Sequence, residues 1–213
     1  MNQPPQSVTL LVTRARFNPP EGWQDRLSRR LDPPWRFNLF FLHQAVHLVD
    51  QPHWHAWLEA GHEASYCAHD HQTLHGPPPL PGIQPGGLAT LGRLIRESSL
   101  TLSIPHLTWP LQSNTTGIKR IAIHQDGDAD DHLQTLRLAA GLAGCDHPVT
   151  LFQATPSPPI SPAAIPYHQA LLALGAQFRS RSSNDPILAD HAVILSLGAT
   201  PRKRRPIRTK KIV

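Results

Sequence analysis

LATLGRLIRESSLTLSI, residues 88–104, places an amphipathic helix directly before a strand. Its first part repeats apolar residues at three- and four-residue spacing, which is the pattern of a helix with one buried face. The residues in this pattern are Leu88, Leu91, Leu94 and Ile95. Its last five residues, Leu100 to Ile104, are rich in aliphatic and β-branched side chains and predict a strand. The stretch therefore predicts an α/β fold.

Upstream of residue 88, strand and helix patterns alternate in the same way. Strands are predicted at 7–13 (SVTLLVT), 35–42 (WRFNLFFL) and 63–67 (EASYC), and helices at 21–31 and 54–61. Alternation of this kind is typical of parallel sheets, because each crossover helix covers a face of the sheet. We expect a parallel sheet with helices on both faces.

The alternation resumes after a Pro-rich segment that reads as a linker. Strands are predicted at 118–124, 149–152 and 191–197, and helices at 167–174 and after Asp128 or Asp130, either of which can cap a helix. The second half thus repeats the plan of the first in shorter form. The expected organisation is one unit at 1–105, a linker at 106–117, a second unit at 118–198 and a tail at 199–213.

Composition limits the functional classes. Seven basic residues lie between 201 and 213, and subtracting them from the net charge of +5 leaves −2 on the rest of the chain. We therefore assign the basicity to a disordered tail. The first residues lack the pattern of a signal peptide, and no apolar run approaches the ~20 residues of a membrane helix. A soluble, cytoplasmic protein is expected.

Cys67 is the leading candidate for chemistry. It ends the predicted strand at 63–67 and enters a polar turn that contains His69, His71 and His75. A protonated histidine nearby, or a helix that begins at Asp70, would favour the reactive thiolate, whereas the Asp70 carboxylate would oppose it. The alternative is a buried, inert strand cysteine, since cysteine is among the most buried residue types.

Other chemistries have weaker support. Cys145 lies between a helix and a strand, and we expect it only to pack there. The 14 histidines suggest a metal site, but those around Cys67 fit no paired-ligand zinc spacing. The glycines between residues 82 and 87 form no phosphate-binding loop, and no serine has a nucleophile-elbow context. We therefore expect neither a cofactor nor a resident metal.

Several segments together resemble the DsrE/DsrF family, which includes the TusD, TusC and TusB sulfur-relay subunits. The resemblance covers roughly residues 7–105 and rests on FNLFFLHQAVH (37–47), a Trp-containing helix, the strand ending in Cys67, and GGLATLGRLI (86–95). Residues 118–196 are similar to a second unit of the TusC/DsrF type. Three features depart from the family: the loop at 14–21 lacks its Gly-containing, small-residue pattern, the first helix is short, and the second half has no cysteine matching Cys67.

This resemblance implies two flavodoxin-like units and a role in sulfur relay. Cys67 matches the family's sulfur-accepting cysteine, which would hold sulfane sulfur as a persulfide for tRNA 2-thiolation or sulfur oxidation, and His69 and His71 are candidates to support its thiolate. Implied partners are a TusA-type donor and other Dsr/Tus subunits in an oligomer. The tail adds a weak RNA contact through Arg202, Lys203, Arg204 and Arg205.

Two other functions stay open at the level of sequence. The chain could be an assembly subunit that binds relay partners without carrying sulfur, which predicts a buried Cys67 that resists alkylation. It could also be a His-rich metal-binding protein, which predicts stoichiometric metal after purification. Even as a relay protein it would be a sulfurtransferase that carries sulfur and does not turn over alone, because a persulfide carrier needs a donor and an acceptor.

Overall fold

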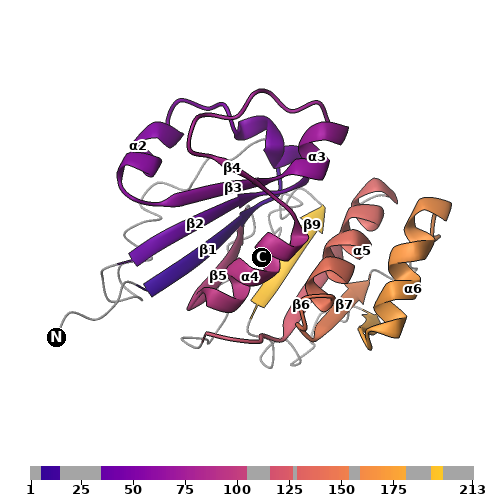
Figure 1. The fold of residues 1–213 in the computed structure, drawn as a ribbon. Coiled ribbons are helices and arrows are strands. Elements are labelled where there is room, and N and C mark those ends of the chain that lie inside the picture. Colours follow the sequence, from indigo (N-terminus) through magenta and orange to yellow (C-terminus); the bar gives the residue numbers. More distant parts are fainter. Residues whose placement is uncertain are drawn as a thin grey trace, which may run out of the picture.

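The structure, a computed structural model, describes residues 6–14, 35–104, 116–126, 129–153, 159–180 and 193–198. In these ranges the chain forms two parallel sheets with helices packed on them (Figure 1). The five-stranded sheet has the order β4-β3-β2-β1-β5, and the four-stranded sheet has the order β8-β7-β6-β9. The predicted α/β class, with parallel sheets flanked by helices, is confirmed.

The five-stranded sheet is built outward from β1 (Gln6–Val12). The strands β2 (Trp35–Phe41), β3 (Glu63–Cys67) and β4 (Gln84–Gly86) follow on one side in chain order. The chain then crosses back, and β5 (Leu100–Ile104) pairs with the other side of β1. Because all pairs are parallel, the carboxyl ends of β1, β2 and β3 lie at one edge of the sheet.

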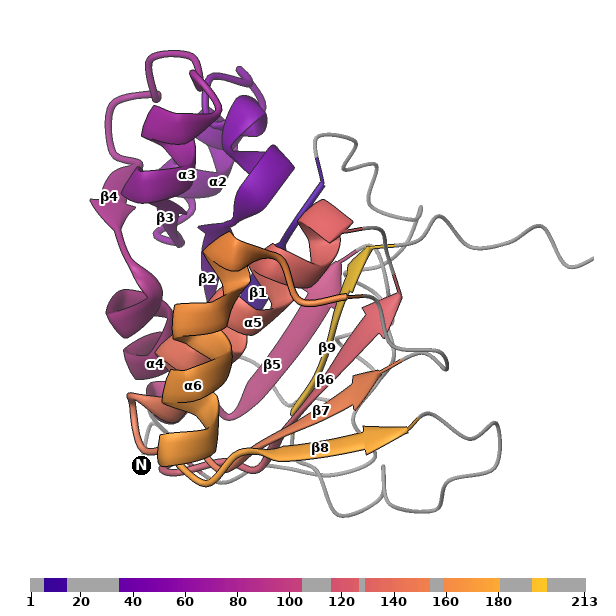
Figure 2. The ribbon, with the colours of Figure 1, turned by 90° about the vertical axis from the view of Figure 1, so that its right-hand side faces the viewer.

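The four-stranded sheet follows the same plan with one strand fewer. The first strand of this half, β6 (Ile121–Asp126), is again internal, with β7 (Val149–Gln153) and β8 (Gln177–Ser180) on one side and β9 (Val193–Gly198) on the other. The strands that end the two halves, β5 and β9, lie against each other, so the two sheets meet edge to edge (Figure 2).

Strand alternation divides the first sheet into two apolar faces. Leu10 of β1, Leu39 of β2 and Tyr66 of β3 point to one face, which is covered by the 3₁₀ helix η1 (His43–Leu48) and by α2 (Trp54–Glu59). On that face the ring of Trp54 packs edge-on against Phe41, with 5.2 Å between ring centroids. Neighbouring residues on each strand, including Cys67, point to the opposite face.

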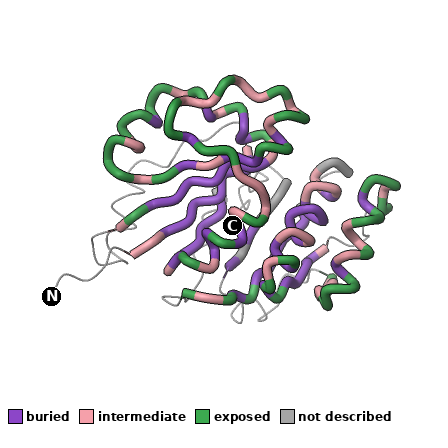
Figure 3. The backbone as a smooth tube through the Cα atoms, in the orientation of Figure 1, coloured by how far each residue is buried: buried purple, intermediate pink, exposed green. Residues whose placement is uncertain are grey.

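On the opposite face the two halves share one apolar core. Helix α4 (Leu88–Glu97) of the first half packs beside α5 (Ala129–Ala143) of the second, and α6 (Ile165–Ala173) packs on α5. Buried side chains from β1, β2 and α4 join those from β6, β7, β9 and α5 in a single cluster. Figure 3 shows this buried layer between the exposed surfaces of the helices and loops.

Two glycines allow α4 and α5 to approach closely. A Cβ added at Gly92 would lie 2.5 Å from Sγ of Cys145, and one added at Gly141 would lie 2.5 Å from Cβ of Leu88. Real Cβ contacts are never this short, so a larger residue at either position would force the helices apart. Close packing of this kind is sensitive to the addition of single methyl groups.

The predicted elements agree with the structure in most places, and the differences have physical causes. The strand predicted from residue 118 begins at Ile121. Neither β4, which consists of Gln84, Pro85 and Gly86, nor β8 was predicted; both are edge strands, and a proline is tolerated at a sheet edge. The helix predicted at 21–31, most of the linker and the tail lie outside the described residues.

The strand order corrects one expectation. Flavodoxin-like sheets run 2-1-3-4-5, whereas the first sheet here runs 4-3-2-1-5. The comparison with flavodoxin therefore holds for the parallel α/β class but not for the strand order. None of the helices in the described ranges has the length and apolar character needed to cross a bilayer.

Candidate thiol site at the junction of the two halves

Cys67 lies where β3 ends and the short helix α3 (Ala68–Thr73) begins. It is the last residue of β3, pairs with Gly86 of β4, and serves as the N-cap of α3. The helix that was expected to begin at Asp70 thus begins two residues earlier. Ligand and catalytic groups of parallel α/β sheets gather at the carboxyl ends of the strands, which is where Cys67 lies.

The thiol is not exposed in this structure. Cys67 is 2% exposed and belongs to the apolar cluster that the two halves share. Of the two alternatives that the sequence left open for its surroundings, the structure shows the buried one. The cause is strand alternation, because Tyr66 faces α2 and Cys67 therefore faces the side of α4 and α5.

Burial is the main influence on the Cys67 thiol, and it raises the thiol pKa above its ordinary value. The Asp70 carboxylate also raises the pKa, while the Asp70 backbone N–H and the Arg137 charge lower it. Since only the thiolate is nucleophilic, Cys67 in this conformation is a weak nucleophile at neutral pH.

Asp70 makes this setting different from a purely apolar one. Its side chain is buried, and Oδ1 accepts a hydrogen bond from Nη2 of Arg137, which lies on α5 in the second half. Its Oδ2 accepts a hydrogen bond of 2.8 Å from the backbone N–H of His43. The backbone of His43 has φ of 54°, a left-handed conformation that histidine adopts more readily than most residues. A buried carboxylate is therefore held by both halves of the chain.

A second contact between α5 and the first half lies beside this pair. Nε2 of His43 is 3.9 Å from Oδ1 of Asp131, with both side chains mostly buried. Asp131 and Arg137 are six residues apart on α5, so one helix of the second half reaches two groups of the first. The candidate site is defined here as Cys67, Asp70, His43, Arg137 and Asp131.

Arg137, His43 and Asp131 are the residues of the site that the sequence reasoning missed, and Arg137 is the one that left a signal. Arg137 lies in the segment LQTLRLAAG, where it is the only charged residue of a mostly apolar stretch in a helix that packs on two neighbours. Such a position predicts a buried charge in need of a partner. The identity of the partner could not be read from the sequence, because Asp70 is 67 residues away.

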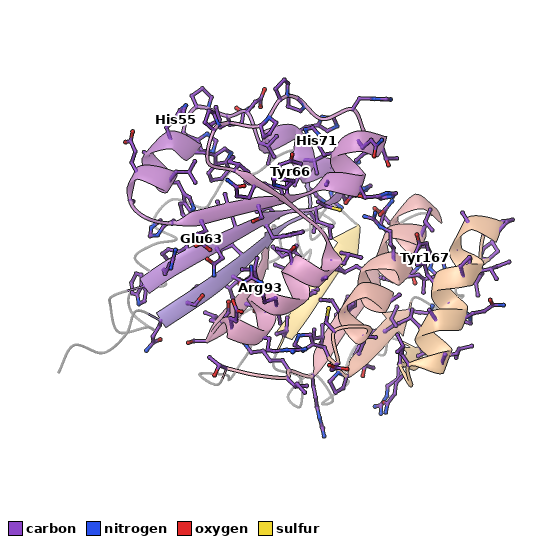
Figure 4. The ribbon with its side chains drawn as sticks, in the orientation of Figure 1. His55, Glu63, Tyr66, His71, Arg93 and Tyr167 are labelled. Atoms are coloured by element: carbon purple, nitrogen blue, oxygen red, sulfur yellow. The ribbon has the colours of Figure 1, made fainter. Side chains whose placement is uncertain are left out.

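The histidines that were expected to support the thiolate are occupied elsewhere or exposed. His71 places Nε2 at 2.7 Å from the carbonyl oxygen of Pro77, and its ring packs on Tyr66 with 4.8 Å between centroids (Figure 4). His69 and His75 are exposed. In the parts of the chain that the structure describes, no three His, Cys, Asp or Glu side chains gather as a metal site.

Cys145 has a packing position in the structure. It follows the end of α5, its sulfur touches the surface of α4 at Gly92, and its carbonyl oxygen accepts a hydrogen bond from Nη2 of Arg96. It is partly buried, and it contributes to the contact between α4 and α5.

A second polar link joins the halves away from Cys67. The ammonium of Lys119, which is 3% exposed, donates to the carbonyl oxygen of Ser98, and burial lowers the Lys119 pKa to about 8. The ring of His147 lies between the Lys119 backbone N–H, 3.1 Å from Nδ1, and the Gly92 carbonyl oxygen, 3.2 Å from Nε2. The junction of the halves therefore contains charged and polar groups at two places.

Comparisons with known proteins add no identification: no family model, curated protein or solved structure matches this chain.

Proposed function

We propose that this chain is a sulfur-relay protein of the DsrE/DsrF type, and that Cys67 carries sulfane sulfur as a persulfide. The observation that carries the proposal is the position of Cys67 at the carboxyl end of β3, next to the buried Asp70–Arg137 pair. A cysteine that only filled space would need no charged neighbours, and burying such a pair costs several kcal/mol of desolvation per ion. Retaining charges at this cost beside a thiol favours a chemical role.

The proposed step is a transfer without net oxidation. The Cys67 thiolate attacks the outer sulfur of a donor persulfide, R–S–SH. A bond forms between Sγ and that sulfur, the S–S bond of the donor breaks, and R–S⁻ leaves with the electron pair. The product is Cys67–S–SH, and an acceptor thiolate or an activated carbon can take the outer sulfur in the next step.

The burial of Cys67 defines how such a carrier would work. In the described conformation the thiol is enclosed in the core that the two halves share, so loading requires a local opening around the end of β3 and α3. Helix α3 has only six residues, and isolated helices of that length are unstable in water, so the contacts that such an opening must break are mainly those of Asp70 with Arg137 and His43. Closure would then shield a persulfide from water and oxidants until an acceptor binds.

Mass spectrometry of the intact protein tests the proposal. Incubation with glutathione persulfide is expected to add one sulfur atom to the wild type and to Cys145→Ser, and none to Cys67→Ser. Equal loading of Cys67→Ser, or no loading of the wild type after prolonged incubation, would rule out carriage by Cys67.

The partners follow the same proposal. A TusA-type donor protein, other Dsr/Tus subunits and a cytoplasmic setting would fit either tRNA 2-thiolation or sulfur oxidation. The basic tail would add a weak, salt-sensitive attraction to RNA phosphates. It contains no aromatic residue on which bases could stack, so this attraction would not depend on sequence.

The second candidate is an assembly subunit that does not carry sulfur, and two observations favour it. One is the burial of Cys67. The other is the surface around α6, which exposes several large apolar side chains: Ile160, Ile165, Leu172 and Leu174. Ile165 and Leu172 share one face of α6, and exposed apolar groups on one surface are typical of protein interfaces. Native alkylation separates the candidates, because a non-catalytic Cys67 would react only at the rate of global unfolding.

A further inference from the structure

The second half of the chain contributes a charged side chain to the Cys67 site, although it has no cysteine of its own there. Arg137 extends from α5 to Asp70, and Asp70 lies in the first turn of the helix that Cys67 caps. The Arg137 side chain is 9% exposed, which means that it faces the junction and not the solvent.

Arg137 has hydrogen-bonding capacity to spare. Its Nη2 donates to Asp70, but its Nε–H is buried and meets no acceptor among the residues that the structure describes. A buried donor on a charged group is costly to leave without a partner. The guanidinium is also close enough to the thiol to act on it electrostatically. The spare donor and the positive charge both suit an anionic sulfur.

We infer that Arg137 is the positioning residue of the Cys67 site: α5 of the second half supplies the cation that holds Asp70 and stabilises the anionic sulfur of Cys67, as thiolate and as persulfide. This inference rests on the proposed function for its purpose, but the charge relationship can be measured without sulfur transfer. It gives the second half a role in the chemistry of the first, so the site would be complete only when both halves are present.

The site contains four charged or titratable groups besides the thiol, of which Asp70 and Arg137 act on the thiol electrostatically. Asp70 lies on α3, His43 follows β2, and Arg137 and Asp131 lie on α5. Asp70 already has two hydrogen-bond donors, and Asp131 lies toward His43. Among the charged residues of the site, Arg137 is therefore the cation that the second half supplies to Cys67.

The test is a pH titration of the Cys67 thiol in a Cys145→Ser background. The NMR signal of cysteine labelled with ¹³C at Cβ reports the protonation state of the thiol at each pH. The sign of the shift separates the two roles that Arg137 could have. Removing a stabilising cation in Arg137→Gln is expected to raise the Cys67 pKa, by about one unit. If Arg137 only closed the junction, its loss would hydrate the thiol and lower the pKa, because burial is what raises it.

Three further variants sharpen the result. Arg137→Lys keeps the charge and should restore most of the wild-type pKa, while Asp70→Asn removes an anion and should lower the pKa. Arg93→Gln removes an arginine from the exposed face of α4 (Figure 4) and should leave the pKa unchanged. These titrations are made on protein whose circular dichroism shows that it is folded, and Arg137→Lys serves as the readout if Arg137→Gln unfolds. In that case a Cys67 pKa that stays near the wild-type value in Arg137→Lys supports the inference.

A Cys67 pKa that is lower in Arg137→Gln than in the wild type would overturn the inference. So would a Cys67 pKa in Arg137→Lys that falls as far as it does in Asp70→Asn. Loading with glutathione persulfide distinguishes this failure from failure of the proposed function. A wild type that gains sulfur while Arg137→Gln gains it equally fast at every pH overturns the role of Arg137 alone. A wild type that gains no sulfur overturns carriage, while the titration still decides the charge relationship.

Discussion

Arg137 and Asp70 form a buried ion pair that connects α5 of the second half to α3 of the first. Their side chains are 9% and 3% exposed, and the Asp70 carboxylate is also held by the His43 backbone N–H. An ion pair removed from water stabilises a fold only weakly on balance, but removal of one partner leaves the other buried without compensation. The pair therefore links the two halves without adding much to the net stability of the fold.

Truncation of either partner should destabilise the protein strongly. Arg137→Ala and Asp70→Ala are each expected to lower the free energy of unfolding by about 3–5 kcal/mol. The double variant Arg137→Met/Asp70→Leu should cost much less, because no charge stays unpaired. Urea denaturation measures these differences. Single and double variants of equal stability would contradict a buried pair at this junction.

Lys119 should make stability depend on alkaline pH. Burial lowers its pKa to about 8 in the folded protein, against about 10.5 in the unfolded chain. Between these values the unfolded state binds more protons, so the contribution of Lys119 to stability rises as pH increases from about 8 to 10.5, and it is unfavourable below that window. We expect an effect of roughly 1–3 kcal/mol.

The Lys119→Met variant isolates that effect. The difference in unfolding free energy between wild type and Lys119→Met should change with pH across the window, with the wild type gaining relative to the variant as pH rises. The comparison cancels the opposite effect of Cys67, whose raised pKa makes the folded state retain its proton longer than the unfolded state. A difference that is constant from pH 7.5 to 10.5 would show that Lys119 titrates normally.

How much of this site the sequence predicts depends on whether a group acts locally or across the fold. The bounds of β3 and β5 agree with the predicted strands, because their side chains alternate or are β-branched within a few residues. The strand β4 has no such signal in Gln84, Pro85 and Gly86, and it exists because the exposed backbone of β3 offers it a partner. Strands with a residue pattern of their own were therefore predicted, whereas a strand that forms only because a neighbouring strand pairs with it was not.

The same distinction explains Cys67. Its position at the end of a strand was predicted from the local residue pattern. That position was compatible with both an exposed and a buried thiol. Its burial depends on α4 and α5, which are packed over it from 20 or more residues away in sequence. His43 and Arg137 were not predicted as site residues, because one acts through its backbone N–H and the other from the second half of the chain.

The close contact between α4 and α5 makes a size prediction. Gly92→Ala places a methyl group 2.5 Å from the Cys145 sulfur and 2.7 Å from its Cβ, so it should destabilise the protein by about 1–3 kcal/mol. Cys145→Gly removes both atoms and should rescue part of that loss in the double variant. Thermal unfolding of the four proteins measures the coupling. Additive effects in that cycle would mean that the two residues do not touch.

If the oligomer expected from the sequence forms through the apolar surface around α6, a second copy of this chain covers that surface. Ile165 and Leu172 lie seven residues apart on α6, which places them on one face, and Leu174 follows the end of the helix. All three are between 44% and 57% exposed. If this face joins two copies, Ile165→Glu/Leu172→Glu should shift the mass measured by sedimentation from dimer to monomer at micromolar concentration. Ile118→Glu, at a residue that is 63% exposed in the segment before β6, is the matched control and should keep the wild-type mass. A wild type that is already monomeric, or a control variant that dissociates equally, would contradict this face as the dimer interface.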